Sequence, residues 1–155
     1  MLPTTAPTFQ ESMLPVAGGI SLRLRTVDIP DGEVQAEAVL THGFGEHSRR
    51  YEHVAAALSG CGIRAWTYDL RGHGRSGGRR GDAVSYELFL KDLGQMIERA
   101  SITGRPCFLL GHSFGGQITL RYLQERQPEI RGAVICSPWL KLAFRTLCAS
   151  VMAWL

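Results

Sequence analysis

The sequence has 155 residues, which is enough for one domain with a hydrophobic core. Apolar residues make up 45% of the chain and charged residues 20%, which are proportions of a globular protein rather than a disordered one. The net charge is only +3, and no aromatic residues interleave with the clustered arginines, so we expect no nucleic-acid partner. We interpret the arginines as solvated loop charges, with steering of an anionic lipid or substrate as the alternative.

The N-terminal half of the chain alternates between strand and helix patterns. Residues 1–18 are rich in Pro and Thr and predict a loose arm, with no charged-then-apolar signal peptide. A strand with one exposed face is predicted over Ile20–Val27, a short strand over Ala36–Thr41, and a helix over Ser48–Leu58 that Gly60 ends.

The second half continues this alternation. Arg64–Tyr68 predicts a strand, Asp69–Gly81 a loop, Ser85–Arg99 an amphipathic helix capped by Ser85, Pro106–Leu110 a strand, Phe114–Gln124 a helix and Gly132–Cys136 a strand. The predicted fold class is therefore α/β, with a mostly parallel sheet and helices on both faces. The apolar runs CFLL and AVIC are typical of strands buried on both sides.

The four cysteines are Cys61, Cys107, Cys136 and Cys148. They form no CxxC pair and have no His at metal-ligand spacing, so we predict neither a metal nor a cofactor. Buried, reduced thiols are expected, which favours a cytoplasmic location. The apolar segment Trp139–Leu155 contains Lys141 and Arg145 and is short for a membrane span, so no transmembrane segment is predicted.

The motif Gly111-His112-Ser113-Phe114-Gly115 follows a predicted strand and precedes a predicted helix. This G-x-S-x-G pattern, in this context, is typical of a nucleophile elbow, where a sharp turn projects the serine hydroxyl above the sheet. We therefore predict Ser113 as a nucleophile. The alternative is a Gly-rich turn with an incidental serine.

A second turn, His42-Gly43-Phe44-Gly45-Glu46-His47, ends the strand Ala36–Thr41. We predict that the backbone N–H groups of Phe44 and Phe114 converge on a developing oxyanion. His42 is expected to tie this turn by hydrogen bonds. His112 is a disfavoured candidate base, because its side chain should point away from Ser113.

Asp69 follows the strand Arg64–Tyr68 and opens the segment DLRGHGRS. We interpret it as the anchor of a hydrogen-bonded loop near the elbow. The alternative is an acidic member of a catalytic triad, but no His is evidently placed to pair with it.

The segments HGFGEHSRRY, YDLRGHGRSGG, FLLGHSFGG and CSPWL together resemble the monoacylglycerol lipase and lysophospholipase group of α/β hydrolases, which overlaps the serine aminopeptidase-like families. The resemblance covers about residues 20–140. It implies hydrolysis of a carboxylic ester or lipid, with Ser113 as nucleophile and Phe44 and Phe114 as oxyanion donors. It also implies a helical cap, of which 139–155 would be the start, after a hydrolase portion at 19–138.

The sequence departs from that group after Ser113, where it has no Asp and no His. In this fold the acid and base follow the serine along the chain, so both triad partners are absent here. We therefore expect an N-terminal fragment or a truncated product that is inactive alone, with possible peripheral contact to a lipid surface in the complete enzyme. The alternatives are a peptidase or thioesterase on the same scaffold, or a non-catalytic binding protein.

Overall fold

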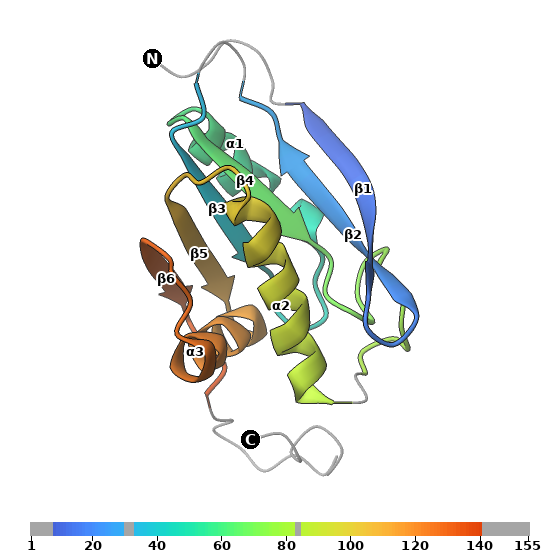
Figure 1. Cartoon of the computed structure of the whole chain (residues 1–155). Helices are drawn as coiled ribbons and strands as arrows, with labels where there is room; N and C mark the ends of the chain where they lie inside the picture. The colour runs from blue at the N-terminus through green and yellow to red at the C-terminus, as the bar shows by residue number, and fades with distance from the viewer. Residues whose placement is uncertain (1–7, 30–32, 83–84, 141–155) are drawn as a thin grey trace.

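The computed structural model describes residues 8–29, 33–82 and 85–140. In chain order its elements are β1 (Phe9–Val16), β2 (Ile20–Val27), β3 (Ala36–Thr41), the 3₁₀ turn η1 (Ser48–Tyr51), α1 (Glu52–Ser59), β4 (Ile63–Tyr68), α2 (Tyr86–Ser101), β5 (Cys107–His112), α3 (Phe114–Arg126) and β6 (Gly132–Cys136). Figure 1 shows one twisted sheet with α2 lying across the face nearest the viewer.

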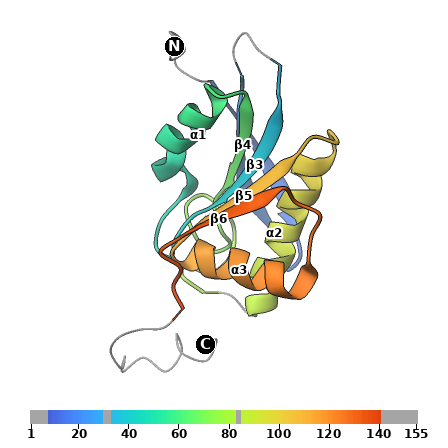
Figure 2. The same cartoon turned by 90° about the vertical axis from the view of Figure 1, so that its left-hand side faces the viewer.

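The described strands form one six-stranded sheet in the order β1-β2-β4-β3-β5-β6. β4, β3, β5 and β6 run parallel to one another, while β1 and β2 pair antiparallel. The sheet carries α1 on one face and α2 with α3 on the other (Figure 2). The α/β class and the mostly parallel sheet are thus confirmed.

Alternation along the central strands divides the core between the two faces. Val39 and Leu109 pack with Leu93 and Met96 of α2, while Ala38 and Leu40 pack with Ala55 of α1. Side chains on a strand point alternately to opposite faces, so a fully apolar strand serves both layers. Ser85 caps α2 as predicted, because its side chain accepts the N–H of Glu87.

The prediction of a loose arm over 1–18 is wrong for β1, which pairs along its length with β2. Only Leu14 in β1 is buried, so the strand has no alternating hydrophobic pattern to reveal it. Pro15 is compatible with this position because β1 is an edge strand with no partner on its outer side in the described sheet.

β2 also differs from its prediction as a strand with one solvent-exposed face. Arg23 and Arg25 are both about 5% exposed, because Glu11 of β1 forms ion pairs with both guanidinium groups. Arg25 also lies over the ring of Phe9 and pairs with Glu52 of α1. Charged side chains can be buried where they are paired, and here β1 and α1 supply the partners.

β6 is not buried on both sides as the run AVIC suggested. Val134 is 54% exposed and Cys136 is exposed, because β5 is the only described neighbour of β6. Cys107 is buried as expected, while Cys61 is exposed. The argument for cytoplasmic location from buried thiols therefore does not hold for Cys61 and Cys136.

Within the described residues, no helix combines the length and apolarity needed to cross a membrane. The predicted start of a helical cap at 139–155 lies outside the described residues, apart from Trp139 and Leu140.

Candidate active site

The predicted site residues lie at one end of the sheet. β3 leads into His42, β4 into Asp69 and β5 into Ser113. Because these strands run parallel, their carboxyl ends meet at the same edge, where ligands bind in open α/β sheets.

Ser113 forms a sharp turn between β5 and α3. Its φ of 52° and ψ of −115° place a non-glycine residue in a sparsely populated conformation. Its N–H donates to Cys136 O at 3.0 Å, and its carbonyl accepts the N–H groups of Gln117 and Trp139, each at 3.0 Å. The surrounding chain therefore holds the strained conformation on both sides of the residue.

Small residues allow this turn to form against the sheet. A Cβ at Gly115 would lie 2.2 Å from Thr41 O, and one at Gly111 would lie 2.6 Å from the Oγ1 of Thr119. Neither distance is possible for real atoms, so both positions require glycine. Gly43 lies on the other side of the serine, where a Cβ would be 3.2 Å from the Cβ of Ser113, a tight but less severe contact.

The turn after β3, residues 42–47, is called the HG turn below. His42 is 1% exposed, its Nδ1 donates to Gly43 O at 2.7 Å, and its Nε2 accepts the N–H of Leu70 at 2.9 Å. Burial lowers the pKa of His42 to about 4, so the ring is neutral at pH 7. The structural role predicted for His42 is therefore consistent with its contacts.

His42 also orients the peptide group between Gly43 and Phe44. In a trans peptide the C=O and the following N–H point in opposite directions. Because Gly43 O is bonded to the ring of His42, the N–H of Phe44 points away from that ring. Phe114 is the first residue of α3, where a backbone N–H has no partner within the helix. Both predicted oxyanion donors thus lie on segments that flank Ser113.

The side chain of Glu46 accepts a hydrogen bond from the backbone within the HG turn. Its Oε2 accepts the N–H of Gly43 at 3.1 Å and the phenol O–H of Tyr51 at 2.8 Å. Burial alone would raise the pKa of Glu46, but these donors, together with Arg50 and His112, hold it below its ordinary value. Sequence reasoning placed Tyr51 on the apolar face of the predicted helix Ser48–Leu58 and gave neither Glu46 nor Tyr51 a role in the site, although both belong to the segment HGFGEHSRRY.

Tyr51 links this carboxylate to the elbow. Its hydroxyl lies 2.7 Å from the Nδ1 of His112, the last residue of β5. Burial and the Glu46 carboxylate raise the pKa of Tyr51, so the phenol keeps its proton. The ring of His112 therefore contacts Tyr51, and its side chain is 41% exposed.

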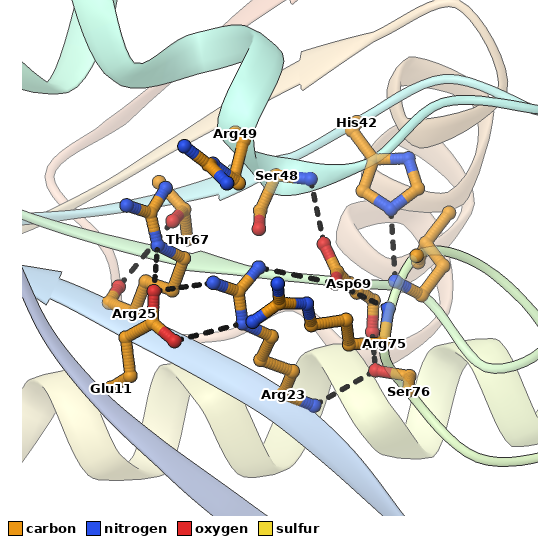
Figure 3. Close-up of polar contacts among 12 residues, drawn as sticks. Glu11, Arg23, Arg25, His42, Ser48, Arg49, Thr67, Asp69, Arg75 and Ser76 are labelled. Atoms are coloured by element: carbon orange, nitrogen blue, oxygen red, sulfur yellow. Dashed lines mark hydrogen bonds and ion pairs between the residues drawn. The ribbon is translucent and has the colours of Figure 1, made fainter.

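Asp69 is buried and receives backbone donors on both carboxylate oxygens. Its Oδ1 accepts the N–H of Ser48 at 2.7 Å, and its Oδ2 accepts the N–H of Arg75 at 2.8 Å. Arg23 lies 3.7 Å from Oδ2 (Figure 3). Burial would raise the pKa of Asp69, but the donated hydrogen bonds lower it below its ordinary value. These contacts fit the loop-anchor interpretation, because both carboxylate oxygens already accept backbone N–H groups.

Aromatic rings border the elbow. The ring centroids of Phe44 and Phe114 are 5.9 Å apart, and Trp139 lies 6.0 Å from Phe44 and 5.9 Å from Phe114, all edge to face. Phe44 is 44% exposed, so part of this cluster is open to solvent. The side chains of the two predicted oxyanion residues therefore form an apolar surface beside Ser113.

A separate open pocket of about 400 Å³ lies between the HG turn and the loop after β4. Its lining residues are Phe44, Gly45, Glu46, Gly72, His73, Gly74, Arg80 and Gly81. Ser113 is not among them. Among the residues that the structure describes, no group of three or more His, Cys, Asp or Glu side chains could hold a metal ion.

Comparison with known proteins identifies the family to which this chain belongs. The family model described as serine aminopeptidase, S33, matches residues 32–155. The chain belongs to this S33 family of α/β hydrolases. Together with the relatives below, this places it in the monoacylglycerol lipase-like group, as the sequence resemblance predicted.

Several similar proteins are longer than this chain. An uncharacterized abhydrolase domain-containing protein of Dictyostelium discoideum is 41% identical, over 81% of this chain and 13% of its own length. Human monoglyceride lipase is 37% identical, over 79% of this chain and 43% of its own. The crystal structure of Paleococcus ferrophilus monoacylglycerol lipase matches with a TM-score of 0.64 at 32% identity, covering 86% of this chain and 44% of that one. The chain thus spans less than half the length of these relatives.

Proposed function

We propose that this chain supplies the nucleophile and the oxyanion donors of a serine ester hydrolase of the monoacylglycerol lipase type. The observation that carries the proposal is the conformation of Ser113, a non-glycine residue held at φ 52° between β5 and α3 with Gly43 against it. A strained turn of this kind persists only where the surrounding structure enforces it, and it is characteristic of nucleophiles.

In the proposed reaction the Oγ of Ser113 attacks the ester carbonyl carbon and its proton passes to a general base. The N–H groups of Phe44 and Phe114 stabilise the tetrahedral oxyanion. The bond from the carbonyl carbon to the alcohol oxygen then breaks, and the alcohol leaves with the proton. Water hydrolyses the resulting acyl-Ser113 ester by the reverse sequence, which releases the acid and restores the serine.

The proposal needs a base and an acid from outside this sequence, since no Asp or His follows Ser113. His42 is an unsuitable base because both of its ring nitrogens are already hydrogen-bonded to backbone groups. The chain alone is therefore expected to show no significant ester turnover, because a serine hydroxyl is a weak nucleophile without an adjacent base.

We propose an apolar, lipid-derived ester as the substrate. The aromatic surface formed by Phe44, Phe114 and Trp139 suits an acyl chain near the serine. The names of the similar monoacylglycerol lipases support the same substrate class. A peptide or thioester substrate remains the enzymatic alternative, because the fold and the elbow do not determine the acyl group.

The test is ester hydrolysis by the protein encoded by the complete gene. We expect turnover of a monoacylglycerol, loss of that turnover in Ser113→Ala, and normal rates in Ser137→Ala. Ser137 is a matched control because it also follows a parallel strand and has a positive φ of 43°. Turnover that survives Ser113→Ala would disprove the nucleophile assignment. A gene that ends at codon 155 and gives an inactive product would favour the non-catalytic binding protein.

A further inference from the structure

The two backbone segments that would supply the oxyanion donors separate beyond the sheet. β3 and β5 pair in register only as far as Thr41 and Gly111. Phe44 and Phe114 both lie past this last pair. Their spacing therefore depends on contacts other than the strand ladder.

Glu46 begins such a connection on the β3 side. Its Oε2 accepts the N–H of Gly43, the residue before Phe44, and also the O–H of Tyr51. The Glu46 side chain is only 16% exposed, so this carboxylate is largely shielded from competing water. Hydrogen bonds to a shielded charged acceptor are stronger than those between neutral groups.

Tyr51 completes the connection on the β5 side. Because its proton is donated to Glu46, its oxygen is free to accept the Nδ1–H of His112 at 2.7 Å. His112 directly precedes Ser113 in the chain. The hydrogen bonds that join Gly43, Glu46, Tyr51 and His112, here called the Glu46 bridge, thus run from the HG turn to the elbow.

We propose that the Glu46 bridge positions the oxyanion donors, so that Glu46 and Tyr51 are positioning residues for the proposed hydrolysis by fixing the distance between the Phe44 and Phe114 segments. This inference rests on the proposed function. The bridge touches neither the serine hydroxyl nor the predicted donor N–H groups. Its effect should therefore appear in stabilisation of the transition state more than in substrate binding.

The decisive variant is Tyr51→Phe in the whole ester-hydrolysing protein, because it removes only the oxygen that joins Glu46 to His112. We expect kcat to fall roughly tenfold with KM within about twofold, a smaller loss than the ~10²-fold that follows removal of an oxyanion donor itself. Affinity for a trifluoromethyl ketone, which forms a tetrahedral adduct with the serine, should weaken by the same factor as kcat/KM. A purely structural role would not produce this correspondence.

Three further variants control the interpretation. Tyr122→Phe, on α3 against Gly94, makes the same chemical change away from the bridge and should leave kcat unchanged. Glu46→Gln keeps an oxygen that accepts from both Gly43 and Tyr51 but loses the charge, so its kcat should fall between those of wild type and Tyr51→Phe. Glu46→Leu removes that acceptor and should match Tyr51→Phe. Wild-type kcat and inhibitor affinity in Tyr51→Phe would overturn the proposal.

Failure of the proposed function would be recognised separately. If the wild-type protein hydrolyses no ester, or if Ser113→Ala keeps the activity, the proposed function is wrong. The bridge is then tested by amide hydrogen exchange at Gly43, whose N–H donates to Glu46. We expect faster exchange in Tyr51→Phe than in wild type or Tyr122→Phe, and equal exchange rates would show that the bridge positions nothing.

Discussion

The carboxylate of Asp69 accepts a hydrogen bond from the backbone N–H of Ser48 at 2.7 Å. The next residue, Leu70, donates its own N–H to the ring of His42 at 2.9 Å. Two consecutive residues at the end of β4 thus hold both ends of the HG turn. The position of Phe44, between these two anchors, is therefore set by the loop after β4 as well as by β3.

Asp69→Asn should lower the free energy of unfolding, and any loss of activity should follow from that loss of stability rather than from removal of a catalytic acid. The amide keeps one oxygen for one of the two backbone donors but places an N–H₂ group against the other, and it leaves Arg23 without this negative charge. Breaking a buried hydrogen-bonded charge network of this kind costs about 3 kcal/mol. The free energy of unfolding in urea measures the loss.

Asp82→Asn is the matched control for Asp69→Asn. Asp82 is 51% exposed and pairs only loosely with Arg79, so its replacement should change stability by less than about 0.5 kcal/mol. If Asp69→Asn were as stable as Asp82→Asn yet lacked activity, Asp69 would be a catalytic acid and the anchor interpretation would be wrong.

The buried ring of His42 predicts a pH-dependent stability. Its folded-state pKa is about 4 and its ordinary value is 6.5, so the unfolded state takes up a proton that the folded state does not. The stabilisation is fully present above pH 6.5 and is lost progressively as the pH falls toward 4, by about 3 kcal/mol in total. Asp69 contributes little in this window, because its pKa lies below 3.8.

Two measurements check the His42 prediction. Urea unfolding between pH 7 and pH 4.5 should show the midpoint falling with pH. The NMR shift of the His42 ring should stay constant from pH 8 to pH 5.5, since the folded-state ring remains neutral. A His42 resonance that titrates near pH 6.5 would contradict a buried ring whose two nitrogens are both hydrogen-bonded to the backbone.

The elements that the sequence predicted best are those whose pattern depends on local packing. The spacing of Phe89, Leu93 and Met96 predicted α2, and all three side chains are buried. β1 and the buried arginines of β2 were missed for a physical reason. Glu11 is charged and Met13 is exposed, so β1 lacks a local signal. Arg23 is buried against two carboxylates from other segments, those of Glu11 and Asp69, which its own strand does not reveal.

In the site, too, features with a local sequence pattern could be predicted, while features that depend on contacts between distant segments could not. Gly111, Ser113 and Gly115 are adjacent in sequence, so their shared turn can be inferred from one motif. The Glu46 bridge joins residues from two segments through side-chain hydrogen bonds. Its members therefore become recognisable as a unit only once β3 and β5 lie side by side.

Ser113→Gly should stabilise the protein while abolishing any serine chemistry. Serine at φ 52° carries conformational strain that glycine avoids, while glycine also loses more backbone entropy on folding. The balance is a gain of about 1 kcal/mol in the free energy of unfolding. Ser113→Ala keeps a Cβ and should leave stability unchanged, so the difference between the two variants in urea isolates the strain. Equal stabilities would show that Ser113 is not strained.

Gly115→Ala tests the contact between α3 and β3 that brings the elbow beneath the HG turn. Its Cβ would lie 2.2 Å from Thr41 O and 2.5 Å from His42 O, and both atoms belong to rigid backbone. Even one methyl group therefore forces the helix and strand apart. Overpacking of this kind costs about 3 kcal/mol or more.

Gly116→Ala is the matched control for Gly115→Ala, because its Cβ would lie 3.2 Å from Gly111 O and 3.3 Å from the Cα of Pro138. That smaller strain is offset by about 1 kcal/mol of helix propensity, so Gly116→Ala should be close to neutral. Urea unfolding of the two variants decides the matter, and equal stabilities would mean that α3 does not lie against the end of β3 as described.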